Sequence, residues 1–145
     1  MSPQRWIVVG TDFSDGARDA LHCAMHLATS LGAAVALVHA YEEDPSMRPE
    51  DEPTARLLGQ LAQEIVLSRR FGPGVHVEPL VRRGRPWEKI LNVATEYGAE
   101  LTVVGSTGQT GGTRGLHLGS VVNRVLALST RSVVVARAPF AVAEV

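Results

Sequence analysis

The feature that most constrains the fold is the regular alternation of short apolar runs with longer helical patterns. Parallel strands need a crossover between them, so this alternation predicts an α/β fold with helices on both faces of a parallel sheet. Four of the five runs are continuously apolar, which indicates strands buried on both faces. The predicted strands are Trp6–Val9, Val35–Ala40, Val75–Val81, Leu101–Val104 and Ser132–Ala136.

Four helices are predicted between these strands. In the first, apolar residues recur at helical spacing from Ala17 to Leu31, with Ser14 as its N-cap and Gly32 as its stop. Gly72-Pro73-Gly74 ends the second helix. The remaining helices are expected over Thr54–Phe71, from Pro86 to Gly98, and over Ser120–Ser129.

The third predicted strand differs from the others. His76 and Glu78 alternate with Val75 and Val77, and Pro79 cannot donate to a strand ladder. This strand therefore belongs at an edge of the sheet. No repeat or second domain is visible, and residues 1–145 are expected to form a single domain.

Composition narrows the function classes. A net charge of −1 with 45% hydrophobic and 20% charged residues gives no reason to expect nucleic acid or a membrane as partner. No apolar run approaches the ~18 residues of a membrane span. The single cysteine, Cys23, fits a reducing compartment, and Ser2–Arg5 leads directly into a strand. The chain is expected to be cytoplasmic.

A glycine-rich run from Gly105 to Ser120 joins the fourth strand to the fourth helix. Such a loop can turn backbone N–H groups toward an anion, and the following helix N-terminus adds unpaired donors. The run contains no lysine, because Lys89 is the only lysine of the chain, so it is not a Walker loop. It also follows a late strand, unlike a dinucleotide fingerprint. A phosphate cradle and a plain surface loop both remain open.

Asp12 follows the first strand, as the glycine run follows the fourth. Ligands bind at the carboxyl ends of parallel strands, so the two features meet in one crevice if these strands are neighbours. Asp12 then accepts from a ribose hydroxyl or an adenine amino group, or helps to hold a metal. Its alternative role is to start the first helix.

Two motifs together carry a family resemblance. With Gly10-Thr11-Asp12-Phe13-Ser14 and Gly105-x-x-Gly108…Gly119-Ser120, the chain resembles the universal stress protein family over nearly its whole length. The resemblance implies a Rossmann-like three-layer sandwich whose five-stranded parallel sheet has the order 3-2-1-4-5. It also implies an adenine nucleotide between strands one and four.

The resemblance also implies the binding residues. Adenosine is expected against the end of the first strand and Ala40, and phosphates against the glycine run and the fourth helix. The implied residues are Gly10, Thr11, Asp12, Ala40, Gly105, Ser106, Gly108, Gly119, Ser120 and Val121. There are two departures from the family. Ten residues, Gln109 to Leu118, separate Gly108 from Gly119 where the family has nine, and Gly10 stands where many binding members have proline.

A bound triphosphate needs its charge offset. Without a loop lysine, the candidates are backbone N–H groups, Arg114, His117 and a divalent cation, Mg²⁺ or Mn²⁺. A hydroxyl for the cation is expected from Ser106, Thr107 or Ser120. The acidic segment Glu42–Glu52 leaves the second strand at the same edge of the sheet. It either favours a metal-bound nucleotide or is simply a solvated loop.

Other candidate groups have simpler interpretations. His22 and His26 lie one turn apart beside Cys23, but two histidines without a third ligand are a weak metal signal, and they fall on the polar face of the first helix. His39 is interpreted as a hydrogen-bonded core histidine. Trp6 and Trp87 are interpreted as packing residues.

The sequence thus predicts a nucleotide-binding stress-response or signalling module that binds ATP with a divalent cation. Its alternatives are an interaction dimer of the same fold without a ligand, and a slow ATP hydrolase. A receiver domain is set aside, because no lysine follows the last strand. The valines of Ser132–Ala136 lack a charged guard before Arg137, which indicates a homodimer through this strand. A further protein partner remains unknown.

Overall fold

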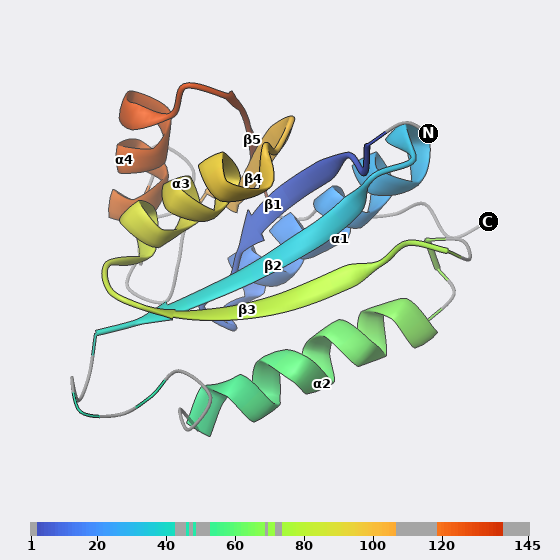
Figure 1. The fold of residues 1–145 in the computed structure, drawn as a ribbon, viewed down its shortest axis with the longest axis horizontal. Helices are drawn as coiled ribbons and strands as arrows, with labels where there is room; N and C mark the ends of the chain where they lie inside the picture. Colours follow the sequence, from blue (N-terminus) through green and yellow to red (C-terminus); the bar gives the residue numbers. More distant parts are fainter. Residues whose placement is uncertain are drawn as a thin grey trace.

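A computed structural model describes residues 3–42, 46, 48, 53–68, 70–71, 74–106 and 119–137. Its elements alternate along the chain as predicted (Figure 1). They are β1 (Trp6–Gly10), α1 (Asp15–Leu31), β2 (Ala34–Tyr41), α2 (Pro53–Leu67), β3 (Val77–Arg83), α3 (Pro86–Tyr97), β4 (Leu101–Gly105), α4 (Ser120–Leu128) and β5 (Ser132–Ala136).

The five strands form one parallel sheet in the order β3-β2-β1-β4-β5, which confirms the expected fold class and strand order. β1 lies in the centre, where Val8 pairs with Ala36 of β2 and with Thr102 of β4. β1 and β4 are parallel neighbours. The turn after Gly10 and the chain after Gly105 therefore both lie at the carboxyl ends of the strands.

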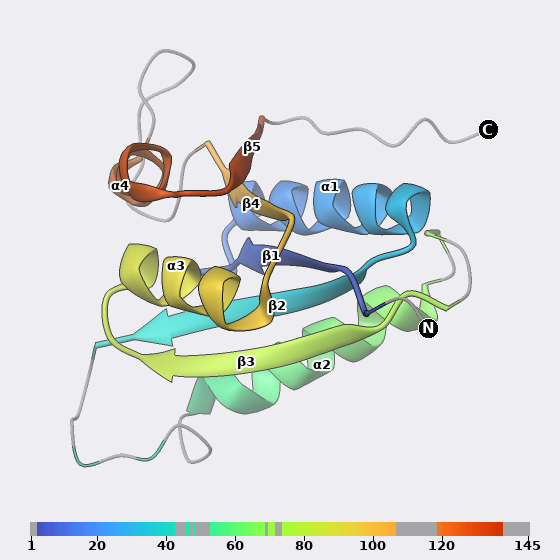
Figure 2. The ribbon, with the colours of Figure 1, turned by 45° about the horizontal axis from the view of Figure 1, so that its top comes forward.

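Helices cover both faces of the sheet (Figure 2). On one face α1 packs mainly against β1 and β4 and α2 mainly against β3, in a cluster that contains Leu21, Leu37 and Leu58. On the other face α3 and α4 pack in a cluster that contains Val93 and Val125. Strands that are apolar on both sides are thereby removed from water on both sides, as their continuous apolar sequences require.

The ends of α1 follow the predicted capping chemistry. The Ser14 hydroxyl accepts from the backbone N–H of Ala17 at 3.2 Å. Gly32 ends the helix in the left-handed conformation, with φ 65°, which a residue without Cβ adopts freely. α3 likewise begins with Pro86 and is capped by left-handed Gly98.

α2 is shorter than predicted, because it ends at Leu67 and not at Phe71. Phe71 leaves the helical path to pack into the core, where it is 4% exposed. Its carbonyl accepts from the Thr29 hydroxyl at 2.5 Å. Burial of the aromatic ring against α1 therefore decides where this helix stops. Gly72 and Pro73, which were expected to stop it, lie outside the described residues.

β3 is displaced by two residues from the predicted range and runs from Val77 to Arg83. It lies at a sheet edge, as Pro79 requires, and among the described strands it pairs with β2 alone. Its later start follows from the register with β2, which continues to the pair Tyr41 and Arg83.

No helix of the described residues is long and apolar enough to cross a membrane.

Candidate functional site

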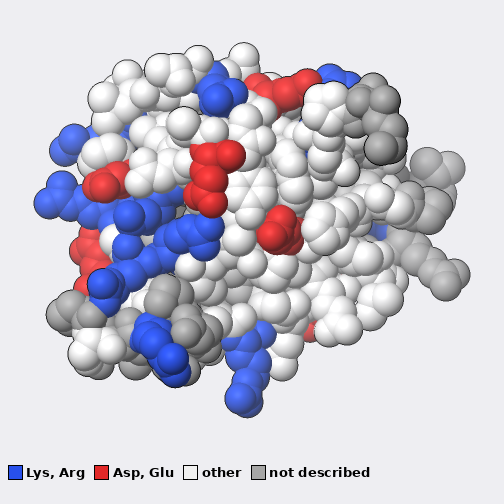
Figure 3. All heavy atoms as spheres, in the orientation of Figure 1, with Lys and Arg blue, Asp and Glu red and all other residues white. Residues whose placement is uncertain are grey.

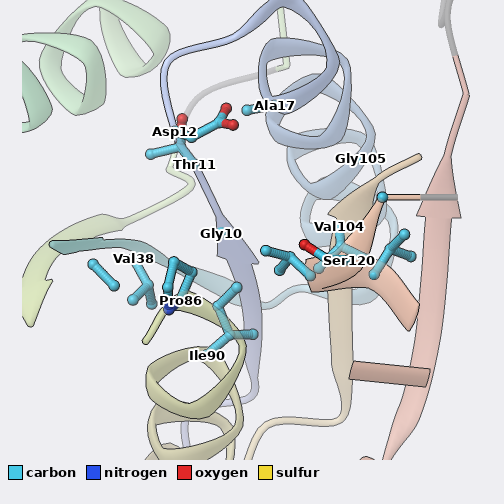
Figure 4. A pocket seen from close by; sticks show the side chains of 14 residues that line it. Gly10, Thr11, Asp12, Ala17, Val38, Pro86, Ile90, Val104, Gly105 and Ser120 are labelled. Carbon is cyan, nitrogen blue, oxygen red and sulfur yellow. The ribbon is translucent and has the colours of Figure 1, made fainter. Parts of the chain in front are cut away.

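A cavity of about 260 Å³ opens at the carboxyl ends of β1, β2 and β4, beside the first turns of α1, α3 and α4 (Figure 4). It brings together most of the residues that the sequence singled out. Of the predicted site, the cavity is lined by Gly10, Thr11, Asp12, Ala40, Gly105, Gly119, Ser120 and Val121.

The turn from β1 into α1 is held by its own polar side chains. Thr11 donates its N–H to the Val38 carbonyl at 2.8 Å, and its hydroxyl accepts from the N–H of Phe13 at 3.0 Å. Asp12 Oδ1 accepts from the N–H of Ser14 at 3.0 Å. Asp12 therefore shapes the turn into the helix and also lines the cavity, so its two predicted roles are compatible.

His39 supports this turn from β2. Its Nδ1 lies 3.0 Å from the Thr11 carbonyl oxygen, and its ring centroid lies 4.9 Å from that of Phe13. The histidine is hydrogen-bonded as expected, but it is half-buried and not in the core. Phe13 adopts φ 65°, an unusual value for a residue with a side chain. The polar contacts around the turn stabilise this conformation.

Gly105 lets α1 approach the end of β4. A Cβ at this position would lie 2.6 Å from the carbonyl oxygen of Gly16 and 2.8 Å from its carbonyl carbon. Both are backbone atoms at the start of α1, so neither can move aside without moving the helix. The glycine thus holds the first turn of α1, including Ala17, against the cavity.

The start of α4 forms the other side of the cavity. Gly119 is its N-cap and provides no side-chain acceptor, while Ser120 and Val121 line the cavity. The N-terminus of this helix therefore supplies donors that suit an anion. Ser106 is not a lining residue. It donates its N–H to the Ala136 carbonyl at 3.0 Å and accepts from the N–H of Gly119 at 2.9 Å.

Part of the predicted phosphate cradle lies outside the described residues. This holds for Gly108 and Arg114, and also for Thr107, His117 and the Gly111-Gly112 pair. The described ends of the glycine run, Gly105–Ser106 and Gly119–Ser120, are joined by the Ser106–Gly119 hydrogen bond. The run therefore leaves and rejoins the fold at the mouth of the cavity.

Sequence reasoning missed the apolar walls. They come from all three layers: Ala17, Val38, Pro86, Ile90, Val104 and Val122. Val38 lies two residues before Ala40 and thus on the same face of β2, and Ile90 lies one turn after Pro86. These spacings could have found some of them. Nothing local shows that α3 closes the cavity beside β2.

Charge is unevenly placed around the cavity. Asp12 is the only ionisable side chain among the described lining residues. Cations gather over the end of β3 and the start of α3, as Figure 3 shows on its left side. Arg83 ends β3, and Arg85 and Lys89 flank the lining residue Pro86 along the chain. The chain around Pro86, on the α3 side of the cavity, is therefore rich in cations.

A second hollow, also about 260 Å³, lies on the other side of the same turn. It is shared between α1 and α2 and includes Thr11, Phe13, Arg18 and Glu64. Thr11 belongs to both cavities. The β1–α1 turn is thus a wall between them, which the sequence did not predict.

The His22 and His26 rings pack against Phe71, with ring centroids 5.6 and 5.1 Å from its centroid. Partial burial lowers the pKa of His22, and burial raises the pKa of the Cys23 thiol. Contact with an aromatic ring accounts for this histidine pair. Trp6 and Trp87 also pack, Trp6 against Tyr97 with ring centroids 4.8 Å apart.

The sequence and the fold were compared with those of known proteins. Residues 5–137 match the Universal stress protein family. The chain belongs to the universal stress protein family. It is 30% identical to the Universal stress protein YxiE of Bacillus subtilis, over 90% of this chain and 97% of that protein.

Two solved structures of universal stress proteins share the fold. One, in complex with cAMP, is 26% identical with a TM-score of 0.70, and the match covers 94% of this chain and 98% of that one. The other, from Archaeoglobus fulgidus in complex with dAMP, is 25% identical with a TM-score of 0.67, over 94% and 99%. These two universal stress proteins thus share the fold and are each solved in complex with an adenine nucleotide.

The structure gives a physical reason for the glycine at position 10, where the family resemblance implied proline in many binding members. Gly10 lines the cavity, and a Cβ on it would lie 2.5 Å from Cδ1 of Ile90. In this chain the space beside the end of β1 is thus taken by an α3 side chain. The longer loop, from Gln109 to Leu118, lies outside the described residues.

Proposed function

We propose that this protein is a stress-response or signalling module that binds ATP with a divalent cation in the cavity between β1 and β4. The observation that carries the proposal is the convergence of the two sequence motifs on one cavity. Apolar walls suit a flat base, and the N-terminus of α4 suits phosphates. The cAMP and dAMP complexes of similar proteins support an adenine nucleotide.

The residues present fit a divalent cation. Asp12 offers a carboxylate and Ser120 a hydroxyl in the same cavity, and Mg²⁺ prefers oxygen ligands while keeping several waters. The nucleotide phosphates would complete its coordination. The single cysteine, Cys23, is buried and supports a reducing compartment, so we assign the module to the cytoplasm.

Titration calorimetry with ATP, with and without Mg²⁺, tests the proposal. Asp12→Asn keeps an oxygen that can accept from Ser14 N–H but removes the charge, so the turn survives while the cation loses its ligand. We expect at least a tenfold loss of Mg²⁺-ATP affinity. Asp15→Asn, an exposed acid in the first turn of α1 that does not line the cavity, is the matched control and should bind as the native chain does.

Two outcomes would contradict the proposal. Equal Mg²⁺-ATP affinities of the Asp12 and Asp15 variants would show that the Asp12 carboxylate takes no part in binding. A native chain that binds neither ATP, AMP nor cAMP would favour the interaction dimer without a ligand. Phosphate release measured in the same samples separates simple binding from slow hydrolysis.

The second part of the proposal is a homodimer through β5. This strand lies at the open edge of the sheet, and its three valines are only partly buried. Leu126 and Leu128 of the neighbouring α4 are 44% and 50% exposed. An unpaired apolar edge favours pairing with a second copy.

A further inference from the structure

The wall of the cavity that α3 supplies contains one large apolar side chain, Ile90. It is 4% exposed and lies one turn after Pro86, so both side chains face the cavity. Figure 4 shows them beside Val38, on the β2 side of Gly10, whereas Val104 and Ser120 lie on the other side. Ile90 thus lines the cavity beside the end of β1.

The position of Ile90 depends on the missing side chain of Gly10. A Cβ on Gly10 would lie 2.5 Å from Ile90 Cδ1 and 3.1 Å from Ile90 Cγ1. The first distance is far below van der Waals contact, so any side chain at position 10 would displace the isoleucine. Ile90 can lie against the strand end only because residue 10 is glycine.

We propose that Gly10 and Ile90 together determine which bases the cavity accepts. This inference rests on the proposed function. With Ile90 against β1, the cavity keeps room for an unsubstituted adenine between α3 and the small Ala40 of β2. In this proposal the N6 edge of the base faces Ile90, so the Ile90 side chain takes the space that a bulky N6 substituent would need. The ligand class is therefore adenine nucleotides without an N6 substituent.

Side chains of different size at positions 10 and 90 should affect ligand binding in different ways. A larger residue at position 10 pushes Ile90 into the cavity and weakens binding of every adenine nucleotide. A smaller residue at position 90 opens the cavity and admits substituted bases, because selectivity against a larger ligand rests on a steric clash. The two changes act on one contact, so their effects are not additive.

The first experiment compares ATP with N6-benzyl-ATP by calorimetry. We expect the native chain to prefer ATP by at least tenfold and Ile90→Ala to reduce this preference at least tenfold. Val93→Ala is the matched control, since Val93 is fully buried on the same helix but does not line the cavity. Its preference should equal the native one. Should Ile90→Ala fail to fold, Ile90→Val with N6-methyl-ATP makes the same comparison with smaller steps.

The second experiment tests the contact itself. Gly10→Ala should weaken ATP binding about tenfold, and Gly10→Ala with Ile90→Val should recover most of the loss, because valine lacks the Cδ1 atom that lies closest. A native chain that binds ATP but shows neither the change in preference nor this rescue would overturn the inference and leave the proposed function standing. A native chain that binds no adenine nucleotide would overturn both.

Discussion

At the scale of a residue, Thr102 in β4 shows how a single atom affects stability. It is fully buried, and its Oγ1 has no hydrogen-bond partner within the part of the chain that the structure describes. Thr102→Val replaces this hydroxyl with a methyl group of similar size, so we expect the free energy of unfolding to rise by about 1 kcal/mol. Urea denaturation measures it. Thr102→Ser, which keeps the hydroxyl and loses the methyl group, should be less stable than the native chain. A less stable valine variant would show that the hydroxyl has a partner.

At the scale of an element, the approach of α1 to β4 depends on Gly105. Gly105→Ala would place a Cβ 2.6 Å from a backbone oxygen of Gly16, so α1 must shift, and we expect a loss of about 1–3 kcal/mol in thermal or urea unfolding. Gly59→Ala is the matched control. Gly59 lies within α2 and a Cβ there meets no atom within 4 Å, so this change should stabilise by about 0.5–1 kcal/mol. Equal effects of the two substitutions would mean that close packing at Gly105 is unimportant.

At the scale of the whole molecule, the proposed dimer follows from the open edge at β5. Ser132→Lys adds a charge at the exposed start of this edge strand, and charged side chains protect edge strands from pairing. We expect the native chain to be a dimer at micromolar concentration and the variant to be a folded monomer, as measured by light scattering after size exclusion with circular dichroism as the check on folding. Leu67→Lys, at a 70% exposed position on α2, should remain a dimer. A monomeric native chain would rule out the β5 dimer.

Some features of the fold could be predicted from the sequence alone. The limits of α1 depend on Ser14 and Gly32, whose capping contacts lie within a few residues of one another. The parallel sheet followed from continuous apolar runs separated by helices, and the edge position of β3 followed from Pro79. The strand order and most of the described site residues came from the family resemblance, because two motifs ninety-odd residues apart matched together.

Tertiary structure decided the rest. α2 ends at Leu67 because Phe71 packs on α1. This contact joins segments that are distant in the sequence, so no local sequence pattern predicts it. Ile90 belongs to the cavity because α3 crosses the end of β1 where Gly10 lacks a side chain. Periodicity and capping report interactions within about one helical turn or one strand pair, so the sequence by itself determined the elements and their layers. The neighbours of a side chain across two elements depend on how those elements pack, and only the folded chain defines the walls of the cavity and the shape of the ligand they admit.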